Sequence, residues 1–301
     1  MQTFTFIGVT TGQSAATRLF PAWARELDLG DVQLVGCDLP IHARPERYRE
    51  VVNRIKADGD ERGGLITTHK VDVFEACRDL FDSVDESAEL CGETSCLAKR
   101  EGRLWAFATD TISSARALAE FYSTTGGGEV LCLGAGGSAA AITVHLIQAR
   151  AVSRITVVNR SARRLEAMRD IHTKLGSDAG VRYVENSDPL INDRLIGDLP
   201  PGSLVINATG MGKDTPGSPI TDDAAFPDRG YVWELNYRGE LDFLHQAERQ
   251  QASRQLQVED GWRYFIHGWA VVMERVFEIE IDDSGLTRLA AVSESERPKT
   301  I

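Results

Sequence analysis

Short apolar segments rich in β-branched residues alternate with longer amphipathic stretches in the first third of the chain. The pattern predicts strands at residues 5–9, 32–36, 65–67 and 104–107. Between them, the stretches 44–57 and 71–80 carry apolar residues at helical spacing. Strands separated by helices of this length indicate βαβ units, so this part of the chain is predicted to be an α/β domain with a mainly parallel sheet.

A second series of strands follows a glycine-rich connection at residues 124–128. The pattern predicts strands at residues 130–133, 155–158, 181–184, 204–206 and 232–235. Such a series is typical of a doubly wound nucleotide-binding sheet. Residues 264–279 then have the spacing of one long helix, and the polar residues at the end of the chain are predicted to form a mobile tail.

Charge and composition narrow the classes of protein that this chain can be. Its 301 residues suit two domains of ordinary size, and its net charge of −12 excludes nucleic acid as a partner. No apolar run is long enough for a membrane span, and the first residues lack the pattern of a signal peptide, so a cytoplasmic protein is predicted. Five scattered cysteines and six histidines form no metal-binding spacing, and no metal is predicted.

The strongest local motif is a glycine turn placed between a predicted strand and a helix. It consists of Gly134, Ala135, Gly136, Gly137 and Ser138, directly after the apolar segment 130–133. Without Cβ atoms, backbone amides can approach a pyrophosphate, and the N-terminus of the helix adds partial positive charge. The motif therefore predicts dinucleotide binding, with a purely structural turn as the alternative.

The residues after the next strand indicate which dinucleotide binds. Asn159, Arg160 and Ser161 follow the predicted strand, with Arg163 and Arg164 close behind. A site for NAD places a carboxylate here for the ribose hydroxyls, whereas guanidinium groups attract the 2′-phosphate of NADP. NADP is therefore favoured over NAD. The alternative is a solvated basic turn.

A second loop at the same predicted edge of the sheet follows the strand at 204–206. It contains Thr209, Gly210 and Met211 within the segment Asn-Ala-Thr-Gly-Met-Gly that starts at residue 207. Ligands of doubly wound sheets lie outside the carboxyl ends of the strands. This loop is predicted to face the nicotinamide half of the cofactor, with an ordinary connecting loop as the alternative.

Lys70 and Asp110 each follow a predicted strand of the first domain. Hydride transfer to a ketone needs a proton donor at the developing alkoxide, and a lysine and an aspartate can share that work. Taken singly, each has the sequence context of a surface charge. Their spacing alone does not separate the two interpretations.

In their order along the chain, these motifs resemble the shikimate dehydrogenase family. The segments similar to the family's catalytic and cofactor-binding motifs are Leu65-Ile66-Thr67-Thr68-His69-Lys70, Ala108-Thr109-Asp110, Gly134-Ala135-Gly136-Gly137, Asn159-Arg160-Ser161, Asn207-Ala208-Thr209 and Asp260-Gly261. The resemblance implies a Rossmann-type NADP domain in which Gly261 is also a cofactor-binding residue, and a catalytic pair formed by Lys70 and Asp110. It further implies hydride transfer between NADPH and a ring carbonyl in aromatic amino acid biosynthesis.

The family's substrate-binding residues are only partly kept. The resemblance implies substrate contacts for Ser14, Thr67, Ser95, Tyr237 and His267. Hydroxyl-binding asparagines of the family correspond to Ser95 and Ala108, and its glutamine on the last helix corresponds to Gly268. Because losing such groups changes which hydroxyl pattern a pocket accepts, the predicted substrate is a shikimate- or quinate-like hydroxy acid or a related cyclitol. Glu93, His267 and Trp269 are candidates for new contacts.

The resemblance also divides the chain into domains. Residues 1–112 and 263–285 are predicted to form the substrate-binding catalytic domain, residues 113–262 the NADP-binding Rossmann domain, and residues 286–301 the mobile tail. Two other functions stay open: a non-catalytic relative that senses NADP(H) or a metabolite, and an NADP oxidoreductase acting on an unrelated keto or imine substrate. A monomer and a homodimer are both compatible with the sequence.

Overall fold

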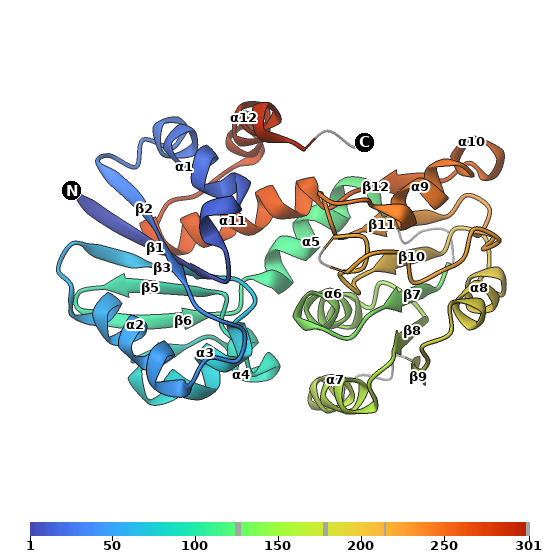
Figure 1. Cartoon of the computed structure of the whole chain (residues 1–301), viewed down its shortest axis with the longest axis horizontal. Helices are drawn as coiled ribbons and strands as arrows, with labels where there is room; N and C mark the ends of the chain where they lie inside the picture. The colour runs from blue at the N-terminus through green and yellow to red at the C-terminus, as the bar shows by residue number, and fades with distance from the viewer. Residues whose placement is uncertain (124–127, 177–179, 214, 299–301) are drawn as a thin grey trace. The chain divides into compact units, whose positions relative to one another are not determined.

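The computed structural model describes residues 1–123, 128–176, 180–213 and 215–298. The chain divides into two compact units (Figure 1). Unit 1 comprises Met1–Ser113 and Ile266–Arg297, and unit 2 is built on Ser114–Phe265. The predicted glycine-rich connection lies outside the described residues except for Gly128. No helix in the described ranges is both long and apolar enough to cross a membrane.

The sheet of unit 1 has six strands in the order β2-β1-β3-β5-β6-β4. The strands are β1 Gln2–Gly8, β2 Val32–Asp38, β3 Glu61–Ile66, β4 Ser83–Val84, β5 Cys96–Arg100 and β6 Arg103–Phe107. All neighbouring strands run parallel except β5, which is antiparallel to both β3 and β6. Glu101 and Gly102 join β5 to β6 with φ angles of 49° and 75°, as a two-residue hairpin turn requires. The predicted mainly parallel sheet is confirmed.

Helices cover both faces of this sheet. They are α1 Ala15–Glu26, α2 Pro45–Ala57, α3 Lys70–Cys77, α4 Glu86–Cys91 and α12 Asp283–Ser293, with short 3-10 turns η1 Thr11–Gln13, η2 Arg78–Leu80 and η4 Glu294–Glu296. Side chains alternate along β1: Ile7 packs in the core under α2 and α3, whereas the Phe4 and Phe6 rings lie against Trp269 on the opposite face. Trp269 is thus a core residue with 4% exposure.

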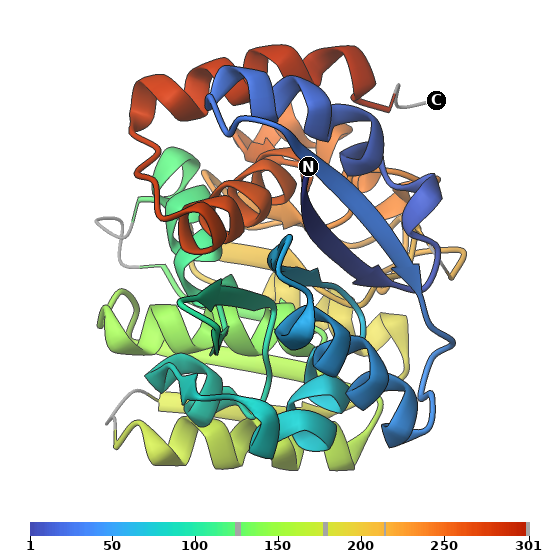
Figure 2. The same cartoon turned by 90° about the vertical axis from the view of Figure 1, so that its left-hand side faces the viewer.

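The end of unit 1 differs from the predicted mobile tail at residues 286–301. Helix α12 continues to Ser293 and packs beside α1, as Figure 2 shows. Leu289 and Ser293 are buried, and the Ser293 Oγ accepts a hydrogen bond of 2.9 Å from the Trp23 indole. The sequence pattern did not predict this helix, because only a few residues of α12 face the core. Residues 299–301 lie outside the described part.

The described residues of unit 2 form six parallel strands in the order β12-β11-β10-β7-β8-β9. They are β7 Val130–Leu133, β8 Arg154–Asn159, β9 Gly180–Glu185, β10 Leu204–Asn207, β11 Tyr231–Glu234 and β12 Gln257–Glu259. Because the strand order reverses between β7 and β10, the sheet is doubly wound, and the predicted Rossmann-type domain is confirmed.

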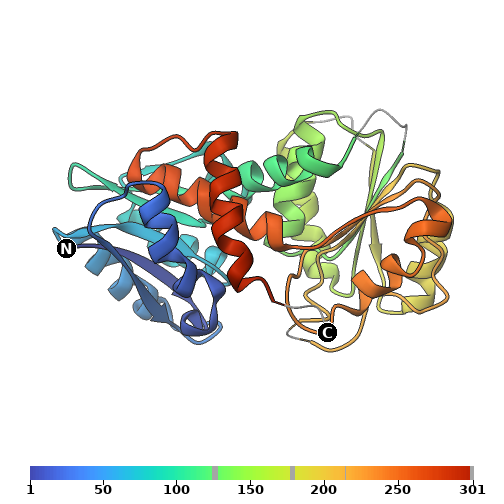
Figure 3. The ribbon, with the colours of Figure 1, turned by 90° about the horizontal axis from the view of Figure 1, so that it is seen from above.

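Two apolar cores sandwich this sheet. Its helices are α6 Gly137–Gln148, α7 Ala162–Lys174, α8 Pro189–Gly197, α9 Asp242–Glu248 and α10 Gln251–Arg254. Residues of α6 and α7 pack on one face, and residues of α8 and α9 on the other, which Figure 3 shows with the sheet nearly edge-on. Two further helices, α5 Asp110–Phe121 and α11 Trp262–Phe277, each have residues in both units.

Candidate functional site

The direction of three strands gathers the charged residues of unit 1. β3 and β6 run in the same direction, and β5 runs between them in the opposite direction. The segments after β3 and β6 and the segment before β5 therefore lie at one edge of the sheet. Backbone hydrogen bonds fix them there: Thr94 N donates to Lys70 O over 3.1 Å, and Ser95 N donates to Phe107 O over 2.9 Å.

Lys70 and Asp110 form an ion pair at this edge. Lys70 is the first residue of α3, Asp110 is the first residue of α5, and the Lys70 Nζ donates a hydrogen bond to the Asp110 Oδ2. The two side chains are only 18% and 12% exposed. Burial disfavours the ammonium, but the charges of Asp110 and Glu93 outweigh it and raise the pKa of Lys70. Lys70 is therefore held as a charged proton donor.

Glu93 places a second carboxyl beside this pair. Its side chain is buried, with 4% exposure of the residue. Within the described part of the chain, no hydrogen bond or ion pair reaches its carboxylate. Burial raises the pKa of Glu93 to about 7, while Lys70 lowers it and Asp110 raises it. The edge of the sheet thus holds two carboxyl groups and one ammonium.

Two buried hydroxyls fix the segment that leads to Asp110. The hydroxyls of Ser95 and Thr109 lie 2.9 Å apart, and the Thr109 backbone N donates to the Ser95 Oγ over 2.8 Å. Both residues are at most 2% exposed. Ser95, expected to contact substrate, thus binds the residue next to Asp110.

The loop before Lys70 adopts an unusual backbone conformation. Thr68 has a φ of 52°, in the left-handed region that β-branched residues avoid. The next residue, His69, is fully buried, and its Nε2 lies 3.1 Å from the backbone carbonyl of Leu39, which can only accept a hydrogen bond. Its Nδ1 lies 3.2 Å from the Tyr48 hydroxyl. His69 therefore ties the start of α3 to neighbouring segments.

The remaining predicted substrate-binding residues are spread over both units. In unit 1, the Ser14 Oγ caps α1 by accepting from Ala16 N, and Thr67 Oγ1 donates to the Ile7 carbonyl over 3.4 Å. His267 is buried in α11 with 3% exposure. Tyr237 belongs to unit 2, where its ring lies 4.8 Å from that of Phe265. Their contacts with a substrate stay predictions.

In unit 2, the predicted glycine turn forms the start of α6. Gly134 has a φ of +121°, and a Cβ there would lie 2.4 Å from the Ala208 carbonyl oxygen. A side chain at this position would separate β7 from the loop after β10. Gly136 is the N-cap of α6 without a side-chain cap, and a Cβ there would meet nothing within 4 Å. The uncapped amides face open space that an anion can occupy.

A cavity of about 470 Å³ lies along this turn. Its lining includes Ala135, Gly136, Asn159, Arg160, Ser161, Arg164, Thr209 and Met211, all predicted to bind cofactor. Arg160 and Arg164 bring positive charge to one end, and none of the described residues that line the cavity is acidic. A phosphate-bearing nucleotide fits this combination of volume, charge and free amides.

Other residues that were predicted to bind cofactor do not line the cavity. Gly134, Gly137 and Gly210 are adjacent in sequence to lining residues but, like Ser138, are not among them. A Cβ on Gly261 would lie 2.1 Å from the Leu235 carbonyl oxygen, so this glycine permits two backbone segments to approach. Its binding of cofactor stays a prediction.

A buried network holds the loop after β10. Asn207 Nδ2 donates to Glu234 Oε2 over 2.6 Å, and Asn236 donates twice to Glu234 Oε1 over 2.7 Å. The Asn207 Oδ1 accepts from the Thr209 hydroxyl and backbone N. Burial raises the pKa of Glu234 to about 8, although these three N–H groups favour the carboxylate. Glu234 thereby orders Thr209 at the cavity.

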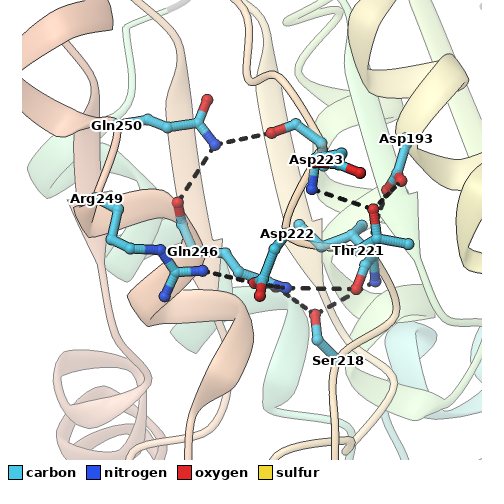
Figure 4. Close-up of polar contacts among 10 residues, drawn as sticks. Asp193, Ser218, Thr221, Asp222, Asp223, Gln246, Arg249 and Gln250 are labelled. Carbon is cyan, nitrogen blue, oxygen red and sulfur yellow. Dashed lines mark hydrogen bonds and ion pairs between the residues drawn. The ribbon is translucent and has the colours of Figure 1, made fainter.

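The cavity is also lined by polar side chains that the sequence patterns did not identify. Asn186, Ser187, Asn192, Thr215 and Ser218 also line the cavity. Figure 4 shows the cluster behind Ser218: its hydroxyl donates to Gln246 Oε1 over 2.6 Å, and Gln246 in turn donates to Asp222. Asp193 accepts from Thr221 N over 3.0 Å, which ties the same loop to α8.

Metal ligands are not grouped in the described residues. Among them, no cluster of three or more His, Cys, Asp or Glu side chains could hold a metal ion.

Comparisons with known proteins agree with this architecture. No family model matches the chain. A shikimate dehydrogenase (NADP(+)) of Xanthomonas oryzae pv. oryzae is 34% identical over 177 residues, which are 58% of this chain and 56% of the relative. The match thus spans little more than half the length of that curated relative. A shikimate dehydrogenase (NADP(+)) of Nitrosopumilus maritimus is 24% identical over 84% of this chain and 86% of its own length.

Solved structures match over nearly the whole chain. Shikimate 5-dehydrogenase of Thermus thermophilus, in complex with NADP(H) and shikimate, has a TM-score of 0.72 and 25% identity, covering 97% of this chain and all of that one. Quinate dehydrogenase of Corynebacterium glutamicum, in complex with NAD, has a TM-score of 0.79 at 21% identity, covering 98% of this chain and 99% of its own.

The fold and the two sites define an α/β protein with one Rossmann-type unit and a second unit that carries a buried Lys–Asp pair. Among proteins of that class, the chain is similar in sequence to shikimate dehydrogenases and in structure to a shikimate 5-dehydrogenase and a quinate dehydrogenase.

Proposed function

We propose that the protein is an NADP-dependent alcohol dehydrogenase that transfers hydride between NADPH and a ring carbonyl, or in reverse from a secondary alcohol. The buried ion pair of Lys70 and Asp110 carries this proposal. A charged lysine kept in a protected site is suited to donate a proton to an alkoxide. A protein that only sensed NADP(H) would have no need of it.

NADP is the proposed cofactor because of the cavity along α6. Arg160 and Arg164 offer guanidinium groups to a 2′-phosphate, and the described lining has no carboxylate that would repel it. The free amides after Gly136 would bind the pyrophosphate. The names of the curated relatives, shikimate dehydrogenase (NADP(+)), support the same choice.

NADPH, when bound, supplies the hydride. In the direction of reduction, Lys70 Nζ donates a hydrogen bond to the substrate carbonyl oxygen and then transfers its proton to that oxygen as the alcohol forms. The neutral amine regains a proton from solvent. Asp110 keeps Lys70 charged before the reaction and orients its Nζ through the hydrogen bond that the two side chains share. Proton donation of this kind raises the rate about 10²–10⁴-fold.

The proposed substrate is a ring-shaped hydroxy acid of the shikimate or quinate kind, or a related cyclitol. Support comes from the Thermus thermophilus relative, whose structure contains shikimate. The pocket of this chain replaces amide groups by Ser95 and Ala108 and adds the carboxyl of Glu93. A hydroxyl or amino pattern other than that of shikimate is therefore part of the proposal.

Absorbance of NADPH tests the proposal, with NADP and NAD offered separately alongside shikimate, quinate, aminoshikimate and related cyclitols. We expect turnover with NADP on one of them and a loss of about 10²-fold or more in kcat for Lys70→Met. Lys56→Met is the matched control, because Lys56 also pairs with an aspartate of unit 1 but lies away from the site. An unchanged rate for Lys70→Met would refute the assigned role. NADPH binding without any turnover would favour a sensor or an unrelated keto or imine substrate.

A further inference from the structure

Glu93 is a buried carboxyl without a partner next to the proposed catalytic pair. It is 4% exposed, and no described residue gives it a hydrogen bond or an ion pair. Burying an ionised carboxylate without a hydrogen bond is costly. An alanine in this place would avoid that cost. A partner brought by a ligand would offset it.

The protein cannot provide that partner from the pair itself. The Lys70 Nζ is bound to Asp110 and, under the proposed function, directs another proton to the reacting oxygen. Thr94 and Ser95, which follow Glu93, direct their hydroxyls to backbone carbonyls and to Thr109. Two carboxyls facing one ammonium leave an excess of hydrogen-bond acceptors at this edge of the sheet.

We propose that Glu93 determines substrate specificity by accepting a hydrogen bond from a donor group, a hydroxyl or an ammonium, on the ring carbon next to the reacting one. The proposal rests on the proposed function, because it takes the reacting oxygen to be the one that receives the proton of Lys70. The residue after Glu93, Thr94, donates its backbone N–H to the Lys70 carbonyl over 3.1 Å, which holds the Glu93 segment beside Lys70 and therefore near the reacting oxygen. A neighbouring substituent of the ring lies within that reach. If that substituent is an ammonium, it and Lys70 are two cations that balance the two carboxylates of Glu93 and Asp110.

The test uses substrates that differ only at the neighbouring carbon. Shikimate and quinate are compared with their 4-deoxy and 4-amino-4-deoxy analogues, because carbon 4 adjoins both possible reacting carbons. The variants are Glu93→Ala and Glu93→Gln, and Glu86→Gln is the control on the exposed side of α4. Initial rates with NADP give kcat/KM for each combination.

We expect Glu93→Ala to lower kcat/KM by about 10²-fold on substrates that carry the donor and to leave the 4-deoxy analogue unchanged. Glu93→Gln keeps an acceptor without charge, so it distinguishes the two donors. If the donor is an ammonium, Glu93→Gln loses nearly as much activity as Glu93→Ala. If it is a hydroxyl, Glu93→Gln keeps most of the activity. Both results support the proposal.

An equal loss on the parent compounds and on both analogues, or no loss on any of them, would overturn the role of Glu93 while leaving the proposed function intact. Absence of turnover by the wild-type protein on the whole panel would overturn the proposed substrate class and this inference with it. Folding of Glu93→Gln is checked by its melting temperature, which is expected to equal or exceed that of the wild type at pH 8, where the variant no longer buries an ionised carboxyl.

Discussion

Replacing Gly134 by alanine tests the close approach on which the cofactor cavity depends. An alanine at a φ of +121° adopts a conformation that L-residues rarely take, at a cost of about 1–3 kcal/mol. Its Cβ would also lie 2.4 Å from the Ala208 carbonyl oxygen, about 1 Å inside ordinary contact. Moving the backbone to relieve that overlap costs about 1–3 kcal/mol more. The sum is about 2–6 kcal/mol.

That cost is measurable as a shift in thermal unfolding. For a unit of this size, about 2–4 °C are lost per kcal/mol, so the melting temperature of Gly134→Ala should fall by at least about 4 °C. NADPH binding, followed by fluorescence, should weaken as well, because the displaced segment continues into Thr209 at the cavity. A melting temperature equal to that of the wild type would refute the reasoning.

Gly136→Ala is the matched control two residues further along. A Cβ there meets nothing within 4 Å, and the residue has an extended backbone that alanine adopts freely. As a less favourable N-cap than glycine, alanine should cost under about 1 kcal/mol. NADPH affinity should nevertheless fall at least about tenfold, because the methyl group occupies the space beside the helix amides. Unchanged affinity would mean that the pyrophosphate does not bind at this turn.

Three further predictions concern unit 2. Arg164→Glu should weaken NADPH binding about tenfold or more in a fluorescence titration and leave NADH binding nearly unchanged; an equal loss for both would contradict a contact with the 2′-phosphate. Burial lowers the pKa of His172 from 6.5 to about 4, so the folded state disfavours its proton, and stability should fall with pH below about 6.5 by at most about 1.4 kcal/mol per unit. Urea unfolding at pH 5 and 7 checks this, and His172→Gln should flatten the dependence. Burial raises the pKa of Glu234 from 4.5 to about 8, so its contribution to stability is present below pH 4.5 and is lost as pH rises through 8. Glu234→Gln should therefore melt at a less pH-dependent temperature between pH 6 and 8 than the wild type does.

The central strands of unit 2 follow from the sequence because their apolar residues are uninterrupted. Predicted strands at 130–133 and 204–206 correspond to β7 and β10, which lie in the centre of the sheet and are buried on both faces. The edge strand β12 gave no such signal. β12, Gln257–Glu259, has two polar residues of three, and its pairing depends on the neighbouring β11 rather than on its own pattern.

The glycine turn was predicted to lie directly before a helix, and α6 begins at Gly137. Glycine and small residues weaken the helical pattern there, and the turn after β7 imposes the helix instead. Trp269 shows the opposite case: its place beside the family's substrate-binding position suggested a contact with ligand, but its ring packs against Phe4 and Phe6.

The polar walls of the cavity escaped prediction for a different reason. Asn192 and Ser218 are each held by a hydrogen bond to a distant part of the chain, and Asn186 in turn donates to Asn192. Asn192 Nδ2, for example, donates to the Pro219 carbonyl over 2.8 Å. Such pairings have no period in the sequence, so only the tertiary structure identifies them.

One unpredicted strand links the fold to the proposed chemistry. Were β3 and β6 direct parallel neighbours, the segments that end in Lys70 and Asp110 would meet with no chain between them. The antiparallel β5 inserts its own beginning at that edge, and the segment before it brings Glu93, Thr94 and Ser95 beside the pair. The sequence identified the lysine and the aspartate as a pair through the resemblance of their segments to the family's motifs. The third charged group, Glu93, lies in the segment that leads into the antiparallel strand β5. Changes in that segment should therefore alter substrate preference while hydride transfer persists.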